Sequence, residues 1–66
     1  MRERRGMVRA ALSRLPAEQR EALNLAFFGG LTRDEIAKHL YTPTGTVKSR
    51  IRRGLHGLRE LVAEAI

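Results

Sequence analysis

Residues 31–51, LTRDEIAKHLYTPTGTVKSRI, predict two helices joined by a short turn. Thr32 and Glu35 lie three residues apart before an apolar run, which is the spacing of a capping box at the start of a helix. The Thr32 hydroxyl is predicted to accept a hydrogen bond from the Glu35 amide, and the Glu35 carboxylate one from the Thr32 amide. Leu31 and Ile36 occupy the two positions of a hydrophobic staple, which sets the angle of chain entry. A short helix of about nine residues is therefore predicted, with an inward face formed by Ile36, Ala37 and Leu40.

A longer helix is predicted to begin at Thr42-Pro43, with the threonine as its cap and the proline at its first helical position. Its apolar residues recur every three or four positions and predict one buried stripe. They are Val47, Ile51, Leu55, Leu58 and Val62. The opposite face carries Lys48, Ser49, Arg52 and Arg53. Gly54 is expected to let a neighbouring helix come close.

Two further helices are predicted upstream of this pair. The first runs from Arg2 to Arg14 and has a narrow apolar stripe, formed by Val8, Ala11, Leu12 and Leu15. Pro16 suits the first turn of the second helix, and Gly29-Gly30 ends it, because glycine accepts the left-handed conformation. The buried face of this helix is expected to include Leu23, Ala26 and Phe27. Phe28 is expected partly at the edge of the core, with a place on a partner surface as the alternative. No segment has the pattern of a strand, so an all-α, small four-helix domain containing a helix-turn-helix is predicted.

The composition limits the classes of function. A chain of 66 residues holds one domain at most, and without cysteine it forms neither a disulfide nor a thiolate metal site. His39 and His56 lack metal-ligand spacing and are expected at the surface, so no metal or cofactor is predicted. Ser13 and Ser49 have no plausible Ser/His/Asp arrangement, so no catalytic residue and no enzyme activity are predicted. No apolar run approaches the roughly 20 residues of a membrane span, and the first residues do not form a secretory signal. A cytoplasmic protein is expected.

The positive charge is concentrated in one segment. The net charge is +6, from 13 Lys and Arg against 7 Asp and Glu. Every charged residue between Pro43 and Arg59 is basic. A basic stripe on one helix indicates a polyanionic partner. Two helices joined by a short turn, the second basic on its outer face, match the helix-turn-helix plan, in which the second helix enters the major groove of DNA.

Three motifs closely resemble region 4 of the extracytoplasmic-function (ECF) sigma factors, a group within the sigma-70 family. They are LPAEQR at 15–20, FGGLTRDEIA at 28–37 and GTVKSRI at 45–51. The resemblance spans residues 15–61, with the motifs in the family's order and at its separations. It implies that residues 15–66 form the sigma region 4 helix-turn-helix domain. Residues 1–14 would form an N-terminal helix at the end of an inter-domain linker, and the whole would be one compact domain.

The resemblance also implies a function and its residues. The chain would bind the promoter −35 element as part of a sigma factor that directs RNA polymerase to initiate transcription. The positions that match base-reading ones are Lys48, Ser49, Arg52 and Arg53, of which Arg52 and Arg53 are the strongest candidates. The positions that match ones near DNA phosphates are Thr32, Arg33, Thr46 and Arg50. The implied partners are double-stranded promoter DNA, the flap of the RNA polymerase core and an anti-sigma factor, with the chain acting as a monomer.

The chain departs from the family pattern in two places. Tyr41 stands where a glycine usually ends the third helix, which predicts a strained or differently shaped turn. Its side chain is expected to pack on a neighbouring helix, with a position near the DNA backbone as the alternative. Gly54 stands where alanine is common. No counterpart of region 2, which reads the −10 element, is present, so the chain is expected to be a fragment of a longer sigma factor.

Three other functions fit parts of the same pattern. A response-regulator-type helix-turn-helix output domain shares the Thr-Val-Lys element, but it usually dimerises and lacks the Leu15-Pro16 entry. A helical module that binds only proteins would use the apolar stripe, and its basic residues would serve solubility alone. A membrane-surface amphipathic segment would also present a basic face. The several capped helices and the absence of tryptophan argue against that last function.

Overall fold

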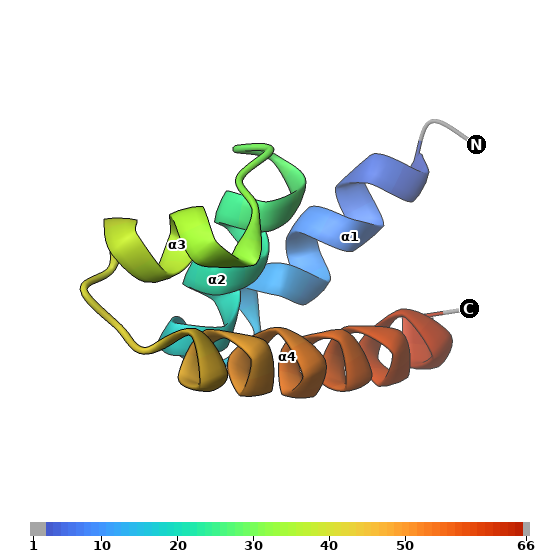
Figure 1. The fold of residues 1–66 in the computed structure, drawn as a ribbon. Helices are drawn as coiled ribbons and strands as arrows, with labels where there is room; N and C mark the ends of the chain where they lie inside the picture. Colours follow the sequence, from blue (N-terminus) through green and yellow to red (C-terminus); the bar gives the residue numbers. More distant parts are fainter. Residues whose placement is uncertain (1–2, 66) are drawn as a thin grey trace.

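Four helices make up the part of the chain that the computed structural model describes, residues 3–65, with side chains described for 6–64. They are α1 (Glu3–Ser13), α2 (Ala17–Phe27), α3 (Arg33–His39) and α4 (Thr44–Ala65) (Figure 1). No strand occurs within this range, which confirms the predicted all-α class. The predicted start of the first helix at Arg2 lies outside the described residues. α3 has seven residues, two fewer than predicted.

The long helix α4 is the platform on which the other three helices pack. α1, α2 and α3 each contact α4, and α2 also contacts α3. In Figure 1, α3 lies over the first half of α4, and α1 lies over its second half. The start of α1 and the end of α4 are therefore at the same end of the molecule. This arrangement leaves the side of α4 that faces away from the other helices free for a partner.

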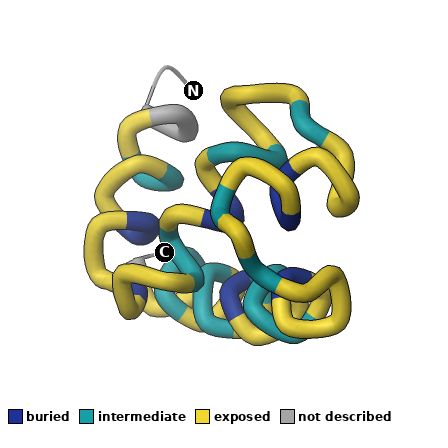
Figure 2. The backbone as a smooth tube through the Cα atoms, turned by 60° about the vertical axis from the view of Figure 1, so that its left-hand side comes forward, coloured by how far each residue is buried: buried dark blue, intermediate teal, exposed yellow. Residues whose placement is uncertain are grey.

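The core consists of two adjoining clusters, and the α4 stripe contributes to both. Leu12, Leu15 and Leu23 form the first cluster, on which Val8, Ile51, Leu55, Leu58 and Leu61 pack. Ile36, Ala37 and Val47 form the second, with Leu25, Ala26, Leu31, Leu40 and Ile51 against it. Ile51 contacts both clusters. Figure 2 shows the buried positions on the inner sides of the helices. The predicted inward face of the third helix is thus confirmed, as is that of the fourth from Val47 to Leu58. At the end of α4, Leu61 and not the predicted Val62 packs on the core, because a step of three residues from Leu58 stays on the buried side.

Gly54 allows α2 to lie directly against α4, as predicted. The residue is buried, and a Cβ atom added to it would lie 2.8 Å from Leu23 Cδ1 and 3.1 Å from Leu23 Cγ. Gly57 has a similar relation to the loop before α2, because its added Cβ would lie 3.0 Å from Leu15 Cδ2. Both glycines cost helix propensity, on the order of 1 kcal/mol each relative to alanine. They are accommodated because they let leucines of the first core cluster reach α4.

The predicted C-terminal end of α2 is confirmed, whereas its predicted start is not. Pro16 is not at the first helical position: with φ −54° and ψ 147° it is the N-cap, and the helix begins at Ala17. The predicted position was therefore wrong by one residue, because Pro16 keeps an extended ψ and only its carbonyl joins the helix, accepting from the Arg20 amide at 3.0 Å. At the other end Gly30 takes a φ of +69°, as expected of the residue that reverses the chain.

The start of α3 is as predicted. Thr32 is the N-cap, and its hydroxyl accepts from the Glu35 amide at 3.2 Å, while the Glu35 carboxylate accepts from the Thr32 amide at 2.8 Å. Leu31 packs against the cluster that contains Ile36, as the hydrophobic staple requires. The two hydrogen bonds between Thr32 and Glu35 fix the direction in which α3 leaves the loop.

The start of α4 differs from the prediction. The Thr42 hydroxyl does not cap this helix, since it donates to the Leu40 carbonyl at 3.0 Å. Pro43 precedes the first helical residue, Thr44, and its carbonyl accepts from the amides of Thr46 and Val47, each at 3.1 Å. The predicted cap and first position were therefore wrong. The reason is the turn before them: Tyr41 has a φ of +52°, so the chain turns sharply there and Thr42 is used to close the turn.

The exposed aromatic residues correct three predictions about packing. Phe27 is 57% exposed instead of buried, and Phe28 is 55% exposed instead of lying at the edge of the core. The core clusters use no residue of α2 beyond Ala26, so neither ring is part of the core. Tyr41 is 96% exposed and does not pack on a neighbouring helix, because the turn directs it outward. These three residues are surface features of the molecule.

Candidate nucleic-acid interface

The outer face of α4 presents the predicted base-reading residues to solvent. Lys48, Arg52 and Arg53 are exposed, and the short side chain of Ser49 is half-buried. Ser49 lies three residues before Arg52 and four before Arg53, which makes the three neighbours on one helix face. Val47, on the other side of the helix, is fully buried against α3. The burial of the apolar stripe therefore determines which way the basic side chains point.

This face is positively charged and not neutralised by the protein itself. Among the described residues, no ion pair involves Lys48, Arg52 or Arg53; the pair recorded on this helix joins His56 and Glu60, at 3.4 Å between Nε2 and Oε2. Glu60 is the first acidic residue after Pro43 in the sequence. The first half of α4 therefore has a surface of uncompensated cations, the arrangement that attracts a polyanion.

The residues predicted near phosphates lie on two elements and differ in availability. Arg33 and Thr46 are exposed, and Arg50 is half-buried. The Thr32 amide is already used by the Glu35 carboxylate, so at this position only the hydroxyl hydrogen is free to donate to an incoming anion. The first turn of α3 also contains the acids Asp34 and Glu35. Arg33 is therefore the stronger candidate on α3.

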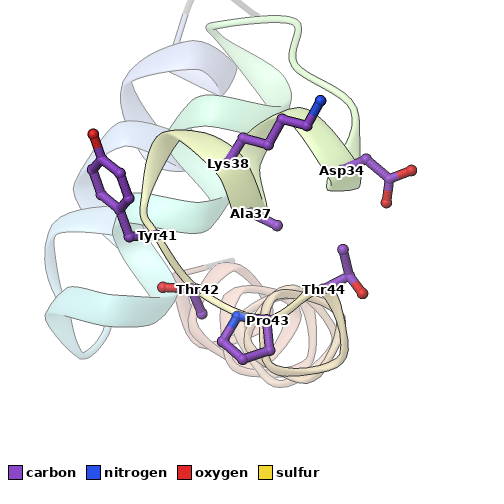
Figure 3. A pocket seen from close by; sticks show the side chains of 7 residues that line it. All are labelled: Asp34, Ala37, Lys38, Tyr41, Thr42, Pro43 and Thr44. Carbon is purple, nitrogen blue, oxygen red and sulfur yellow. The ribbon is translucent and has the colours of Figure 1, made fainter.

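An open hollow separates α3 from the start of α4. It is lined by Asp34, Ala37, Lys38, Tyr41, Thr42, Pro43 and Thr44 (Figure 3). In this view Asp34 lies on the α3 side of the hollow and Thr44 on the α4 side, whereas the Tyr41 ring points away from the other lining residues. The hollow has one carboxylate and one amine and no arrangement for acid–base or nucleophilic chemistry. It marks the gap of the helix-turn-helix rather than an active site.

A second group of basic residues, which the sequence pattern did not single out, lies between α1 and α2. The Arg9 guanidinium carbon is 5.3 Å from the centre of the Phe28 ring, within cation–π range. Arg20 donates to the carbonyls of Ser13 and Leu15, both at 3.4 Å, and so closes the end of α1. No periodic signal could have revealed this group, because its members meet only when α1 and α2 pack together.

Other kinds of site find no support in the described chain. No group of three His, Cys, Asp or Glu side chains within it could hold a metal ion. His39 and His56 are exposed, as predicted. None of the described helices is both long enough and apolar enough to cross a membrane.

Comparison with known proteins agrees with this geometry. The family model of sigma-70 region 4 matches residues 5–56. The ECF RNA polymerase sigma factor RpoE of Cereibacter sphaeroides is 43% identical over 60 residues, which are 91% of this chain and 33% of that protein. The ECF RNA polymerase sigma factor SigK of Mycobacterium ulcerans is 46% identical over 57 residues, 86% of this chain and 30% of that protein. The chain thus spans about a third of the length of the relatives it matches.

The packing of α3 and α4 across the Tyr41 turn defines a helix-turn-helix domain. The chain belongs to the sigma-70 region 4 family, and its similarity is to the ECF sigma factors. The resemblance seen in the three sequence motifs is therefore confirmed. This family consists of transcription initiation factors and not of enzymes, in agreement with the prediction.

Proposed function

We propose that this chain binds double-stranded DNA at the promoter −35 element, as the region 4 domain of an ECF sigma factor that directs RNA polymerase to initiate transcription. The observation that carries the proposal is the outer face of α4, where Lys48, Arg52 and Arg53 are exposed without an acidic partner among the described residues. Membership of the sigma-70 region 4 family supports the same function.

The chemistry of the face suits the major groove. Arginine forms two parallel hydrogen bonds with the O6 and N7 atoms of guanine, and serine donates to or accepts from several base edges. Arg52 and Arg53 would therefore read bases, with Lys48 and Ser49 beside them. Thr32, Arg33, Thr46 and Arg50 would contact phosphates, which position the domain without reading sequence.

The protein partners proposed for the domain are the flap of the RNA polymerase core and an anti-sigma factor. The names of the relatives, ECF RNA polymerase sigma factors, support the first. An apolar groove on the second half of α4, lined by Leu55, Leu58, Arg59, Val62 and Ala63, is available to a protein partner. The proposed state is a cytoplasmic monomer that binds DNA together with the polymerase.

A salt titration tests whether the chain binds DNA. Affinity of the 66-residue chain for a fluorescent duplex is measured between 50 and 200 mM salt, and a selection on random duplex follows. The logarithm of affinity is expected to fall with the logarithm of salt concentration, with a slope of about −0.9 per phosphate contacted. The selection is expected to enrich one short sequence as a single, unrepeated site.

Three other results would each contradict the proposal. An apparent duplex affinity that does not change with salt concentration would indicate a module that binds only proteins. Enrichment of a two-fold repeated site would indicate a dimeric output domain of the response-regulator type. Co-sedimentation with anionic liposomes in place of duplex binding would indicate a membrane-surface segment.

A further inference from the structure

His56 continues the basic face of α4 by one turn. It lies four residues after Arg52 and three after Arg53, and residues at these spacings are neighbours on one face of a helix. It lies nine positions after buried Val47, which at about 100° per residue places the two on opposite sides of α4. The His56 side chain is 75% exposed. It therefore projects in the same direction as the proposed base-reading residues.

The length of α4 places His56 at the border of the groove. α4 has 22 residues and is about 33 Å long, whereas the major groove is about 12 Å wide. The helix thus extends beyond the groove that its first half would occupy. His56 lies about 8 Å along the helix axis from the midpoint of Lys48 and Arg53. With α4 crossing the groove, half the groove width is about 6 Å, so this position would meet the bordering sugar-phosphate backbone.

The charges around His56 make its protonation state matter. Its neighbours on α4 are the cations Arg52, Arg53 and Arg59 and the carboxylate of Glu60, which is 3.4 Å away. Within the described range, no hydrogen bond or ion pair joins His56 to α1, α2 or α3. A neutral imidazole would leave Glu60 to repel an approaching phosphate, whereas a protonated one both offsets Glu60 and attracts the phosphate. Histidine as a residue type changes charge between about pH 5 and 8.

We infer that His56 is a further DNA contact, which binds a phosphate of the duplex in its protonated form and makes the affinity for DNA increase as the pH falls. This inference rests on the proposed DNA binding by α4. The contact is to the backbone and is independent of base sequence, so any duplex reports on it.

The test measures duplex affinity of the 66-residue chain as a function of salt, at pH 5.8 and at pH 7.4. Wild type is expected to bind about threefold more tightly at pH 5.8, with a salt slope steeper by up to about 0.9, because one phosphate contact is gained. His56→Gln should remove this difference. His56→Lys should bind tightly at both pH values, because its charge is permanent. His39→Gln is the matched control, since the chain has two histidines and His39 lies on α3, away from this face.

The outcomes separate the inference from the proposed function. If His56→Gln keeps the wild-type difference between the two pH values, His56 is not the contact and the inference is wrong, while DNA binding stands. The same holds if His39→Gln abolishes the difference. If wild type shows no salt-dependent affinity for duplex at either pH, the proposed function itself fails, and the inference fails with it. Circular dichroism verifies that each exposed substitution leaves the helical content unchanged.

Discussion

Tyr41 holds a backbone conformation that an L-residue rarely adopts and receives no packing in return. Its φ of +52° lies in the left-handed region, which costs a residue with a Cβ atom about 1–2 kcal/mol. The ring is 96% exposed, so burial does not offset this cost. Backbone hydrogen bonds hold this conformation instead. The Tyr41 amide donates to the Lys38 carbonyl, and the Thr42 amide donates to the Ala37 carbonyl.

Tyr41→Gly is therefore expected to stabilise the domain. Glycine removes the steric cost but makes the unfolded chain more flexible, by about 0.4–1 kcal/mol, so the net gain should be about 0.5–1 kcal/mol. Urea unfolding followed by circular dichroism measures it. Tyr41→Ala is the control, because alanine keeps the Cβ atom and loses the ring. A glycine variant that is less stable than the alanine variant would show that the turn is not strained by the Cβ.

Arg53 is expected to discriminate a single base pair, because one guanidinium can form two hydrogen bonds with one guanine. Arg53→Ala is expected to cost about 1–3 kcal/mol of binding to the selected −35 sequence and to reduce discrimination at one position. The measurement compares affinity for the selected duplex with that for a scrambled duplex. An equal loss on both would identify Arg53 as a phosphate contact, and its assignment as a base reader would be withdrawn.

α3 and α4, the two helices of the helix-turn-helix, differ in how their first turns are capped. α3 has a reciprocal side-chain cap formed by Thr32 and Glu35. α4 begins after Pro43, whose carbonyl accepts the first helical hydrogen bonds, while the Thr42 hydroxyl closes the preceding turn. The position of α3 thus depends on a local side-chain pair, and that of α4 on the shape of the turn.

Thr32→Ala is expected to lower the free energy of unfolding by about 0.5–2 kcal/mol, because the Glu35 amide loses its acceptor. Thermal unfolding compares it with Thr32→Ser, which keeps the hydroxyl and should unfold close to wild type. Thr42→Ala does not remove a helix cap. We therefore expect it not to lower the helicity of α3 by as much as loss of the Thr32 cap does. If Thr32→Ala were as stable as wild type, the capping box would not contribute to folding.

At the scale of the whole molecule, one helix both completes the core and presents the basic face. Val47 is fully buried in the cluster that joins α3 to α4, and Ile51 links that cluster to the one formed by α1 and α2. Packing and recognition therefore occupy opposite sides of the same 22-residue helix. A change on the apolar side acts on the fold, and a change on the basic side acts on binding.

Val47→Ala tests this division. It is expected to lower the free energy of unfolding by about 1–4 kcal/mol, a large share of the stability of so small a domain. Lys48→Ala, at the next residue but on the outer face, should leave the midpoint of urea unfolding nearly unchanged and weaken duplex binding. If the Lys48 variant lost stability and the Val47 variant did not, the assignment of the buried face and the exposed face would be reversed.

The sequence alone determined the features that depend on neighbours along the chain. The Thr32–Glu35 box, the Gly30 reversal and the α4 stripe from Val47 to Leu58 are set by spacings of three or four residues, which one helix turn brings together. The outward direction of Lys48, Arg52 and Arg53 follows from the same periodicity. These short-range patterns were sufficient to predict the fold class and the exposed basic face.

Features that depend on contacts between helices could not be predicted from the sequence and follow from how the helices pack. Phe27 lies at a position that the α2 pattern allows in the core, and it is exposed because no helix covers that end of α2. Leu23 against Gly54 and Arg9 over Phe28 join segments distant in sequence, so no local spacing encodes them. The role of Thr42 likewise depended on how sharply the chain turns at Tyr41. Periodicity specifies which side of a helix is apolar, and packing specifies how far along the helix that side is covered.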